Sequence, residues 1–186
     1  MTPTGQKARM LAGELYLAHD PALVAERRRA QRLLARFNGA DPDDDAARAE
    51  ALAALLGSLG DGAMVNPPFR CDYGAQITIG ARSFLNFGCV LLDCARIVIG
   101  AEVQIGPGVQ LYTATHPIDA ATRRAGWEAA LPIAIDDGVW LGGGVIVCPG
   151  VSIGENSVVG AGSVVTRSLP ANVVAAGNPC RVLRPC

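Results

Sequence analysis

The chain has 186 residues, half of them apolar, which predicts one domain with a substantial core. Its 16 basic and 17 acidic residues give a net charge of −1, so the composition shows no sign of a surface that binds nucleic acid. No segment is long and apolar enough to cross a membrane and no signal-peptide pattern is found, so we expect a cytoplasmic protein with reduced cysteines.

Residues 1–60 predict a helical lead-in that packs against the rest of the chain. Helical apolar spacing covers Met10–Ala18 and Ala22–Phe37, with Asp20 as the N-cap of the second helix. The acidic run DPDDD then predicts a turn and another N-cap. A third helix, rich in Ala and Leu, is expected over 46–59.

From Tyr73 onward the chain repeats every six residues. The repeat shifts by two residues before Ile99 and stops at His116. From Ile135 to Thr166 it runs without a slip, and the first hexads there read IDDGVW, LGGGVI and VCPGVS. A period of six matches neither a helix nor a plain strand, so it predicts a short strand and a tight corner repeated around an axis, which is a parallel β-helix. We expect the first residue of each hexad to point inward and the frequent glycine at the second position to take the corner with a positive φ.

The repeat is interrupted once and ends in a tail. The segment 117–132 carries no aliphatic period and predicts a loop that leaves the solenoid, where binding and catalytic residues concentrate. The tail 170–186 predicts a short strand and a turn at GNP that closes the coil. The two expected parts are therefore the lead-in, 1–60, and a β-helix domain, 61–186, that contains both the loop and the tail.

The chemistry open to the chain is limited by its two histidines, His19 and His116. Zinc sites need three or four ligands, and the cysteines show no ligand spacing, so we expect no metal. His116 stands where the regular hexads give way to the loop, and imidazole is the side chain best suited to take a proton near neutral pH. A hydrogen-bonded structural histidine at the start of a loop is the alternative.

Three strings in the chain resemble a known family. LYTATHPIDAATRRAGWE, with PPFRCDYG before it and GNPCRVLR after it, resembles the maltose O-acetyltransferases, which belong with the galactoside and nodulation acetyltransferases of the hexapeptide-repeat class. MLAGELY extends the match into the lead-in, so it covers nearly the whole chain. The resemblance implies a left-handed parallel β-helix assembled as a homotrimer, with active sites between subunits. It also implies acetyl-CoA as co-substrate along the coils and a sugar hydroxyl that attacks the thioester directly.

The resemblance implies roles for individual residues. His116 matches the catalytic base, and Glu128 is a candidate catalytic helper that orients the imidazole. Four residues match contacts to the acceptor sugar: Arg27, Asp72, Asn86 and Asp93. Six match contacts to coenzyme A: Gly143, Ala161, Thr166, Arg167, Arg181 and Arg184.

Structural alternatives stand beside these roles. Asn86 could replace glycine at a corner, Asp93 could cap a turn, and Glu128 could simply be solvated. The paired arginines of the tail could serve solubility alone. The acceptor could instead be a nodulation-type oligosaccharide, an amino acid or a xenobiotic, and a non-catalytic scaffold is the remaining alternative.

Overall fold

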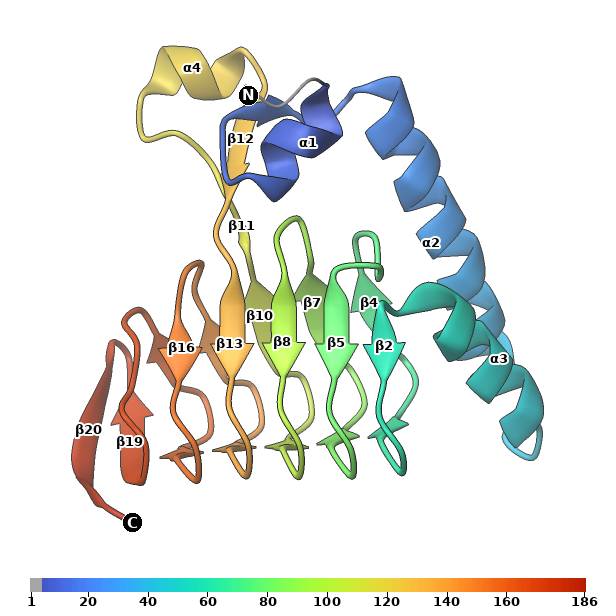
Figure 1. The fold of residues 1–186 in the computed structure, drawn as a ribbon. Coiled ribbons are helices and arrows are strands. Elements are labelled where there is room, and N and C mark those ends of the chain that lie inside the picture. Colours follow the sequence, from blue (N-terminus) through green and yellow to red (C-terminus); the bar gives the residue numbers. More distant parts are fainter. Residues whose placement is uncertain (1–4) are drawn as a thin grey trace.

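The computed structural model describes residues 5–186 and consists of stacked triangular coils with a helical lead-in (Figure 1). The coils form three parallel sheets, one on each face of a prism. The first face contains β2 (Ser58–Leu59), β5 (Ile77–Ile79), β8 (Ile97–Ile99), β13 (Ile133–Ile135) and β16 (Ser152–Ile153). The second contains β3 (Met64–Val65), β6 (Phe84–Leu85), β9 (Gln104–Ile105), β14 (Trp140–Leu141), β17 (Val158–Val159) and β19 (Val173–Gly177). The third contains β4 (Arg70–Cys71), β7 (Val90–Leu92), β10 (Gln110–Tyr112), β15 (Ile146–Val147) and β18 (Val164–Val165).

The core is built from two positions of each hexad. The first residues, such as Leu141 and Val147, are fully buried, as predicted, and so are the fifth residues, such as Val139. Where the fifth residue is serine, its hydroxyl bonds a backbone carbonyl, as Ser157 does with Pro170 O at 2.8 Å. A buried hydroxyl needs such a partner, so serine is accepted inside the coil. The predicted parallel β-helix with a helical lead-in and an excursion is confirmed.

The predicted role of the corner glycines was wrong in one respect. Positive φ falls on the fourth residue of the hexad, as at Gly138, Gly144 and Asn156, and not on the second. Glycine is required at the second position because the coils stack closely there. A Cβ built on Gly142 would lie 2.6 Å from Ala161 N of the next coil. The fourth position of a hexad therefore favours glycine because of its backbone conformation, and the second position requires glycine because of the space available.

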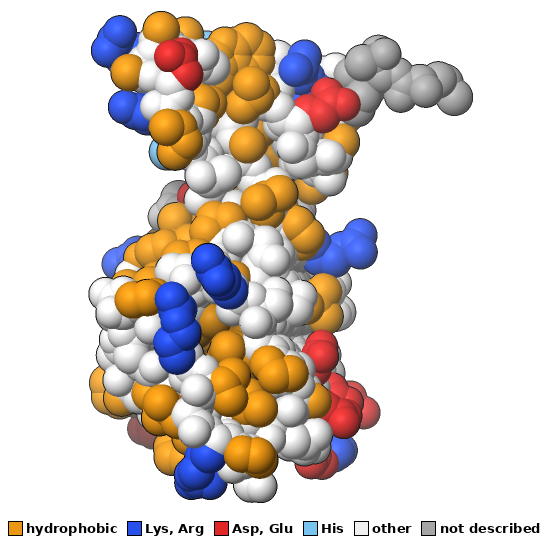
Figure 2. Space-filling model, turned by 90° about the vertical axis from the view of Figure 1, so that its left-hand side faces the viewer, with side chains coloured by type: hydrophobic (Ala, Val, Ile, Leu, Met, Phe, Trp, Pro, Cys, Tyr) orange, Lys and Arg blue, Asp and Glu red, His pale blue; other side chains and the backbone are white. Residues whose placement is uncertain are grey.

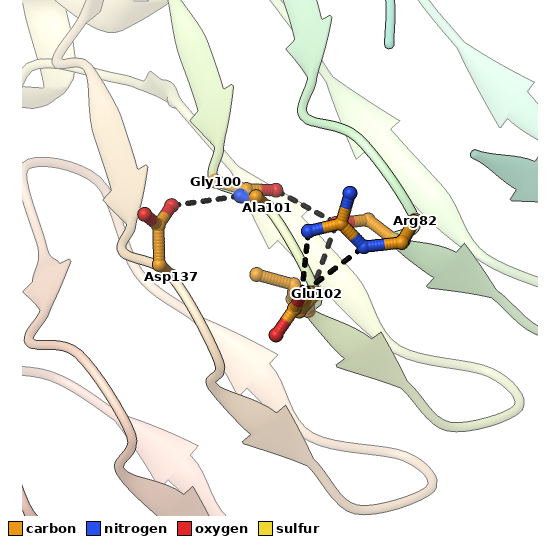
Figure 3. Close-up of polar contacts among 7 residues, drawn as sticks. Arg82, Gly100, Ala101, Glu102 and Asp137 are labelled. Carbon is orange, nitrogen blue, oxygen red and sulfur yellow. Dashed lines mark hydrogen bonds and ion pairs between the residues drawn. The ribbon is translucent and has the colours of Figure 1, made fainter. Parts of the chain in front are cut away.

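Polar groups line the corner between the first and second faces (Figure 3). Arg82 and Glu102 both have φ 57°, and the Glu102 Oε1 atom accepts from Arg82 Nε at 3.0 Å and from its Nη2 at 2.5 Å. On the next coil Asp137 Oδ1 accepts from Ala101 N at 2.7 Å. Because the ion pair is exposed, it adds little stability. Backbone bonds between coils, such as Glu102 N to Ala81 O at 2.9 Å, hold this corner.

The lead-in contains three helices with bounds that differ from the prediction. They are α1 (Gln6–Leu11), α2 (Pro21–Gly39) and α3 (Asp45–Leu55). The expected helix over Met10–Ala18 was wrong, because Gly13 at φ 74° ends the turn and the chain continues as strand β1 (Tyr16–Leu17). The third helix stops before β2. Both predicted N-caps are confirmed, since Asp20 accepts from Ala22 N and Asp44 from Ala47 N, each at 2.9 Å.

The lead-in packs in two places. Leu34 and Phe37 of α2 and Leu55 of α3 share one apolar core with the first coils. Met10 and Tyr16 belong to a second, smaller core that includes Ala130 of the segment 117–132. The lead-in is thus packed both against the first coils of the solenoid and against the segment that interrupts the repeat.

The interruption is a structured excursion. It contains β11 (Ala114–Thr115), α4 (Ala120–Arg124) and β12 (Trp127–Ala130), and it leaves the prism between the third and first faces (Figure 1). Its strands and that of the lead-in form a sheet of their own, in the order β1-β12-β11. Viewed from the end of the prism, the excursion is joined by a narrow neck (Figure 2).

The tail closes the solenoid as predicted. β19 turns back through Asn178-Pro179 into β20 (Cys180–Pro185), which pairs with it antiparallel. Among residues 5–186, no helix has the length and apolarity needed to cross a membrane.

Candidate active site

His116 lies directly after β11, and its side chain is exposed. In the antiparallel pair β11/β12, Thr115 is opposite Ala129. One further step along this register, just past the end of β11, would bring residue 116 opposite Glu128, and opposite residues in an antiparallel pair point to the same side. Both sequence candidates for the proton transfer therefore lie on one edge of the excursion.

Glu128 is held by the lead-in. It is half-buried, and its Oε2 atom accepts from the hydroxyl of Tyr16 at 3.0 Å. The backbones pair at the same point, because Tyr16 is opposite Glu128 in the β1/β12 register. The alternative of a merely solvated Glu128 does not describe this geometry.

Asp72 and Arg27 lie close enough to each other and to Glu128 for their charges to interact. Asp72 is half-buried, and its Oδ2 atom is 3.4 Å from Cys94 Sγ. Burial raises the pKa of Asp72, while the Cys94 thiol and the charge of Arg27 lower it. The Arg27 guanidinium donates to Tyr73 Oη at 2.9 Å and to Ala18 O at 2.6 Å. The structure thus groups two residues that the resemblance assigns to the acceptor.

Cys94 is a member of this group that the sequence analysis missed. It is buried, and burial together with the charge of Asp72 raises the pKa of its thiol to about 12. It therefore stays protonated and can donate to Asp72. Its only signal in the sequence is its place beside Asp93, just before the repeat shifts phase.

Asp93 acts as a turn cap. Its side chain is 0% exposed and accepts from Asp72 N at 3.0 Å, Tyr73 N at 2.8 Å and Gln76 N at 3.3 Å. Burial raises the pKa of Asp93 to about 6, against these hydrogen bonds. The structural alternative therefore fits Asp93 better than direct contact with an acceptor, because the carboxylate is covered and shapes the turn that bears Asp72.

A groove of about 490 Å³ lies on the second face. Its lining includes three of the expected residues, Asn86, Gly143 and Ala161. Asn86 has no positive φ, and Gly88 has the left-handed conformation in that hexad, so the corner-glycine explanation of Asn86 was wrong. Trp140, 55% exposed, lies on the outer side of β14 and also lines the groove.

The other four coenzyme candidates lie toward the C-terminal end of the prism. Thr166 and Arg167 follow β18, and all four side chains are exposed. Within residues 5–186, the side chains of Arg181 and Arg184 in β20 each make one hydrogen bond, to the backbone carbonyls of Cys180 and Pro185. Basic and apolar side chains share the surface at this end (Figure 2). The guanidinium groups therefore keep donors free for an anionic ligand.

Metal ligation has no support in the part of the chain that the structure describes. No three His, Cys, Asp or Glu side chains of residues 5–186 are grouped so that they could hold an ion. All six cysteines are free thiols.

Two family models match the chain. Residues 9–60 match the maltose acetyltransferase hexapeptide capping motif, and residues 132–167 match the bacterial transferase hexapeptide with six repeats. The capping motif covers the lead-in, and the six repeats begin where the excursion returns to the solenoid.

Whole-chain comparisons give the same picture. Nodulation protein L of Rhizobium meliloti is 48% identical over 182 residues, which is 98% of this chain and 99% of the relative. The crystal structure of a maltose O-acetyltransferase from Clostridium difficile superposes with a TM-score of 0.98 at 46% identity, covering 99% of this chain and 98% of that one. A hexapeptide-repeat acetyltransferase of Vibrio cholerae, solved with acetyl coenzyme A, has a TM-score of 0.91 at 40% identity and 98% coverage of both chains. The chain therefore belongs to the hexapeptide-repeat acetyltransferases, in the family of the maltose O-acetyltransferases.

Proposed function

We propose that the protein transfers the acetyl group of acetyl-CoA to a hydroxyl of a sugar such as maltose, glucose or a galactoside, with His116 as general base. The observation that carries the proposal is the exposed imidazole directly after β11, with Glu128 on the neighbouring strand β12 and with Asp72 and Arg27 grouped near Glu128. Family membership supports the acyl transfer, and the local geometry supports the choice of base.

The reaction needs no covalent enzyme intermediate. The His116 imidazole takes the proton of the acceptor hydroxyl, and the oxygen forms a bond to the acetyl carbon. The carbon–sulfur bond then breaks, and the imidazolium returns its proton to the leaving sulfur. A positioned base of this kind contributes roughly 10²–10⁴-fold to the rate. Cys71, Cys89 and Cys94 are poor alternative nucleophiles, since burial raises the pKa of their thiols.

The second-face groove is the proposed coenzyme site. Gly143 and Ala161 leave space for a pantetheine arm close to the backbone, and Trp140 offers an apolar wall. Thr166, Arg167, Arg181 and Arg184 complete the proposed site toward the tail, where arginine donors match phosphate geometry. The Vibrio cholerae relative was solved with acetyl coenzyme A, which supports this donor.

A homotrimer with active sites between subunits is part of the proposal. In one chain the excursion leaves the edge between the third and first faces, whereas the groove lies on the second face across the prism (Figure 1). A neighbouring copy could supply His116 to this groove. Exposed apolar side chains mark both surfaces, Met64 at 60% and Trp140 at 55% on the second face and Ile118 at 94% on the excursion.

Mixed assemblies test this arrangement. His116→Ala and Gly143→Phe each disable one half of the site, so each should be inactive alone. After the two are unfolded and refolded together, some interfaces combine an intact His116 with an intact groove, and activity should return. Absence of any recovery, with mixed trimers demonstrated by mass, would show that both halves belong to one chain.

The acceptor and the compartment remain parts of the proposal. The similarity to nodulation protein L favours a nodulation-type oligosaccharide as the second candidate acceptor. A panel of sugars, oligosaccharides, amino acids and xenobiotics, followed by thiol release from acetyl-CoA, ranks them by kcat/KM. Thiol release with none of them, and no thermal shift with acetyl-CoA, would favour the scaffold alternative. The proposed compartment is the cytoplasm, where six free cysteines stay reduced.

A further inference from the structure

Tyr16 is buried where the lead-in meets the excursion. Its side chain is 0% exposed, and its hydroxyl donates to Glu128 Oε2 at 3.0 Å. A buried tyrosine hydroxyl needs a partner, and a backbone carbonyl would satisfy it. Here the partner is a carboxylate, which makes a stronger, charge-assisted bond.

The same hydroxyl also lies against the Cys94 thiol. Cys94 Sγ is in turn 3.4 Å from Asp72 Oδ2, so Tyr16 and Cys94 lie between the Glu128 and Asp72 carboxylates. The titratable and charged groups around the Tyr16 hydroxyl come from three parts of the protein. Cys94 and Asp72 belong to the solenoid, Glu128 belongs to β12, and Arg27 belongs to α2. Burial raises the pKa of Tyr16 far above its usual value, so the hydroxyl remains a donor at every working pH.

The position of Glu128 matters because of its neighbour across the strand pair. The β11/β12 register ends with Thr115 opposite Ala129, and one further step would bring residue 116 opposite Glu128, where the Cβ atoms of paired strands lie about 4.5–5.5 Å apart. A carboxylate held next to an imidazole favours the protonated ring and can fix its orientation. A glutamate side chain has several rotatable bonds, so its effect depends on what holds it.

We propose that Tyr16 is a positioning residue for acetyl transfer: its hydroxyl holds the Glu128 carboxylate beside His116, so that the lead-in, outside the solenoid, sets the geometry of the base. The inference rests on the proposed function of His116. It adds a role for a residue that touches neither acceptor nor coenzyme.

The test compares Tyr16→Phe, which removes only the hydroxyl, with Glu128→Gln and the double variant. We expect kcat to fall about tenfold in Tyr16→Phe, the scale of one lost hydrogen bond to a charged group, with the KM for acetyl-CoA unchanged. The acid limb of the kcat/KM profile should move to lower pH, because a released carboxylate supports the imidazolium less. Glu128→Gln should move it in the same direction, and the double variant no further.

Tyr73→Phe is the matched control. Tyr73 is 2% exposed, and its hydroxyl bonds Arg27 instead of Glu128. Its loss should leave the acid limb at the wild-type pH. A wild-type acid limb in Tyr16→Phe, or additive effects in the double variant, would overturn the inference.

Glu128→Asp gives a second route if Tyr16→Phe does not fold. It keeps the charge but withdraws the carboxylate from the hydroxyl by one methylene, and it leaves the lead-in intact. The acid limb of the kcat/KM profile of Glu128→Asp should move to lower pH, as expected for Tyr16→Phe. A wild-type profile would show that only the charge of residue 128 matters, and it would refute the positioning role. Near-normal turnover of His116→Ala would instead refute the proposed function, so the two failures are distinguishable.

Discussion

Cys94 and Asp72 face each other across the turn below the excursion, with Sγ 3.4 Å from Oδ2. The thiol is the donor, because its pKa is raised to about 12. Cys94→Ala should therefore lower kcat/KM for the acceptor, by about three- to tenfold for one lost hydrogen bond, and leave the KM for acetyl-CoA unchanged. Cys94→Ser restores a donor and should recover most of the loss. Equal values for Ala and wild type in steady-state assays would show that the pair is only packing.

His116→Ala should lower turnover by roughly 10²–10⁴-fold without unfolding the chain, because the imidazole is exposed and only the base is lost. Thiol release from acetyl-CoA measures the turnover, and circular dichroism checks the fold. His19→Ala is the matched control: it removes the other histidine, also exposed and outside the proposed site. Turnover near wild type in His116→Ala would contradict the assignment of the base.

The buried Asp93 carboxyl should make the free energy of unfolding depend on pH. Burial raises the pKa of this carboxyl to about 6 in the folded chain, whereas the pKa is about 3.9 in an unfolded one. Between these values the folded state binds more protons, so its contribution to the free energy of unfolding falls as pH rises from about 4 to about 6, by about 3 kcal/mol. Urea unfolding of wild type and Asp93→Asn across this range measures it.

The free energy of unfolding of Asp93→Asn should fall less with rising pH than that of wild type. At low pH the variant should be less stable than wild type, because the amide accepts hydrogen bonds differently from the carboxyl group. Asp61→Asn, at an exposed corner, is the control and should keep the wild-type slope. Parallel curves for wild type and Asp93→Asn would mean that this carboxyl does not cause the dependence.

The two corner glycines should respond differently to alanine. A methyl group on Gly142 would lie 2.6 Å from Ala161 N, so Gly142→Ala forces the coils apart and should cost about 1–3 kcal/mol in the free energy of unfolding. Gly144 has open space but φ 68°, so its alanine variant carries only the strain of the left-handed conformation, about 1–2 kcal/mol. Gly39→Ala, with neither constraint, should be neutral or stabilising by up to about 1 kcal/mol. Denaturant unfolding gives all three values.

Coenzyme binding should depend on the second-face groove. Saturating acetyl-CoA should raise Tm in wild type, because a ligand bound only by the folded state stabilises it. Gly143→Phe fills the groove and should abolish the shift, whereas Gly39→Phe, remote from it, should keep the shift. A full shift in Gly143→Phe would place the coenzyme elsewhere.

Local chemistry explains which parts of the fold could be read from the sequence. A period of six with an aliphatic first residue predicts the solenoid, because each coil buries that residue only by stacking on the next. Asp20 and the acidic run DPDDD predicted the two caps, because capping depends on neighbours in the chain, and the structure places them at Asp20 and Asp44. The helix expected over Met10–Ala18 failed because Tyr16 pairs with a strand far along the chain, and a partner of that kind overrides local propensity.

The candidate site divides in the same way. By itself the sequence determined the coils, the interruption after His116 and, through resemblance to a family, the reaction class. Only the tertiary structure decided that Asp93 is covered by backbone donors, that Cys94 joins Asp72, and that Tyr16 holds Glu128. The reason is physical. A hexad reports contacts between successive coils, whereas these three relationships join residues 20, 22 and 112 positions apart, whose meeting depends on the packing of the lead-in and the excursion on the prism.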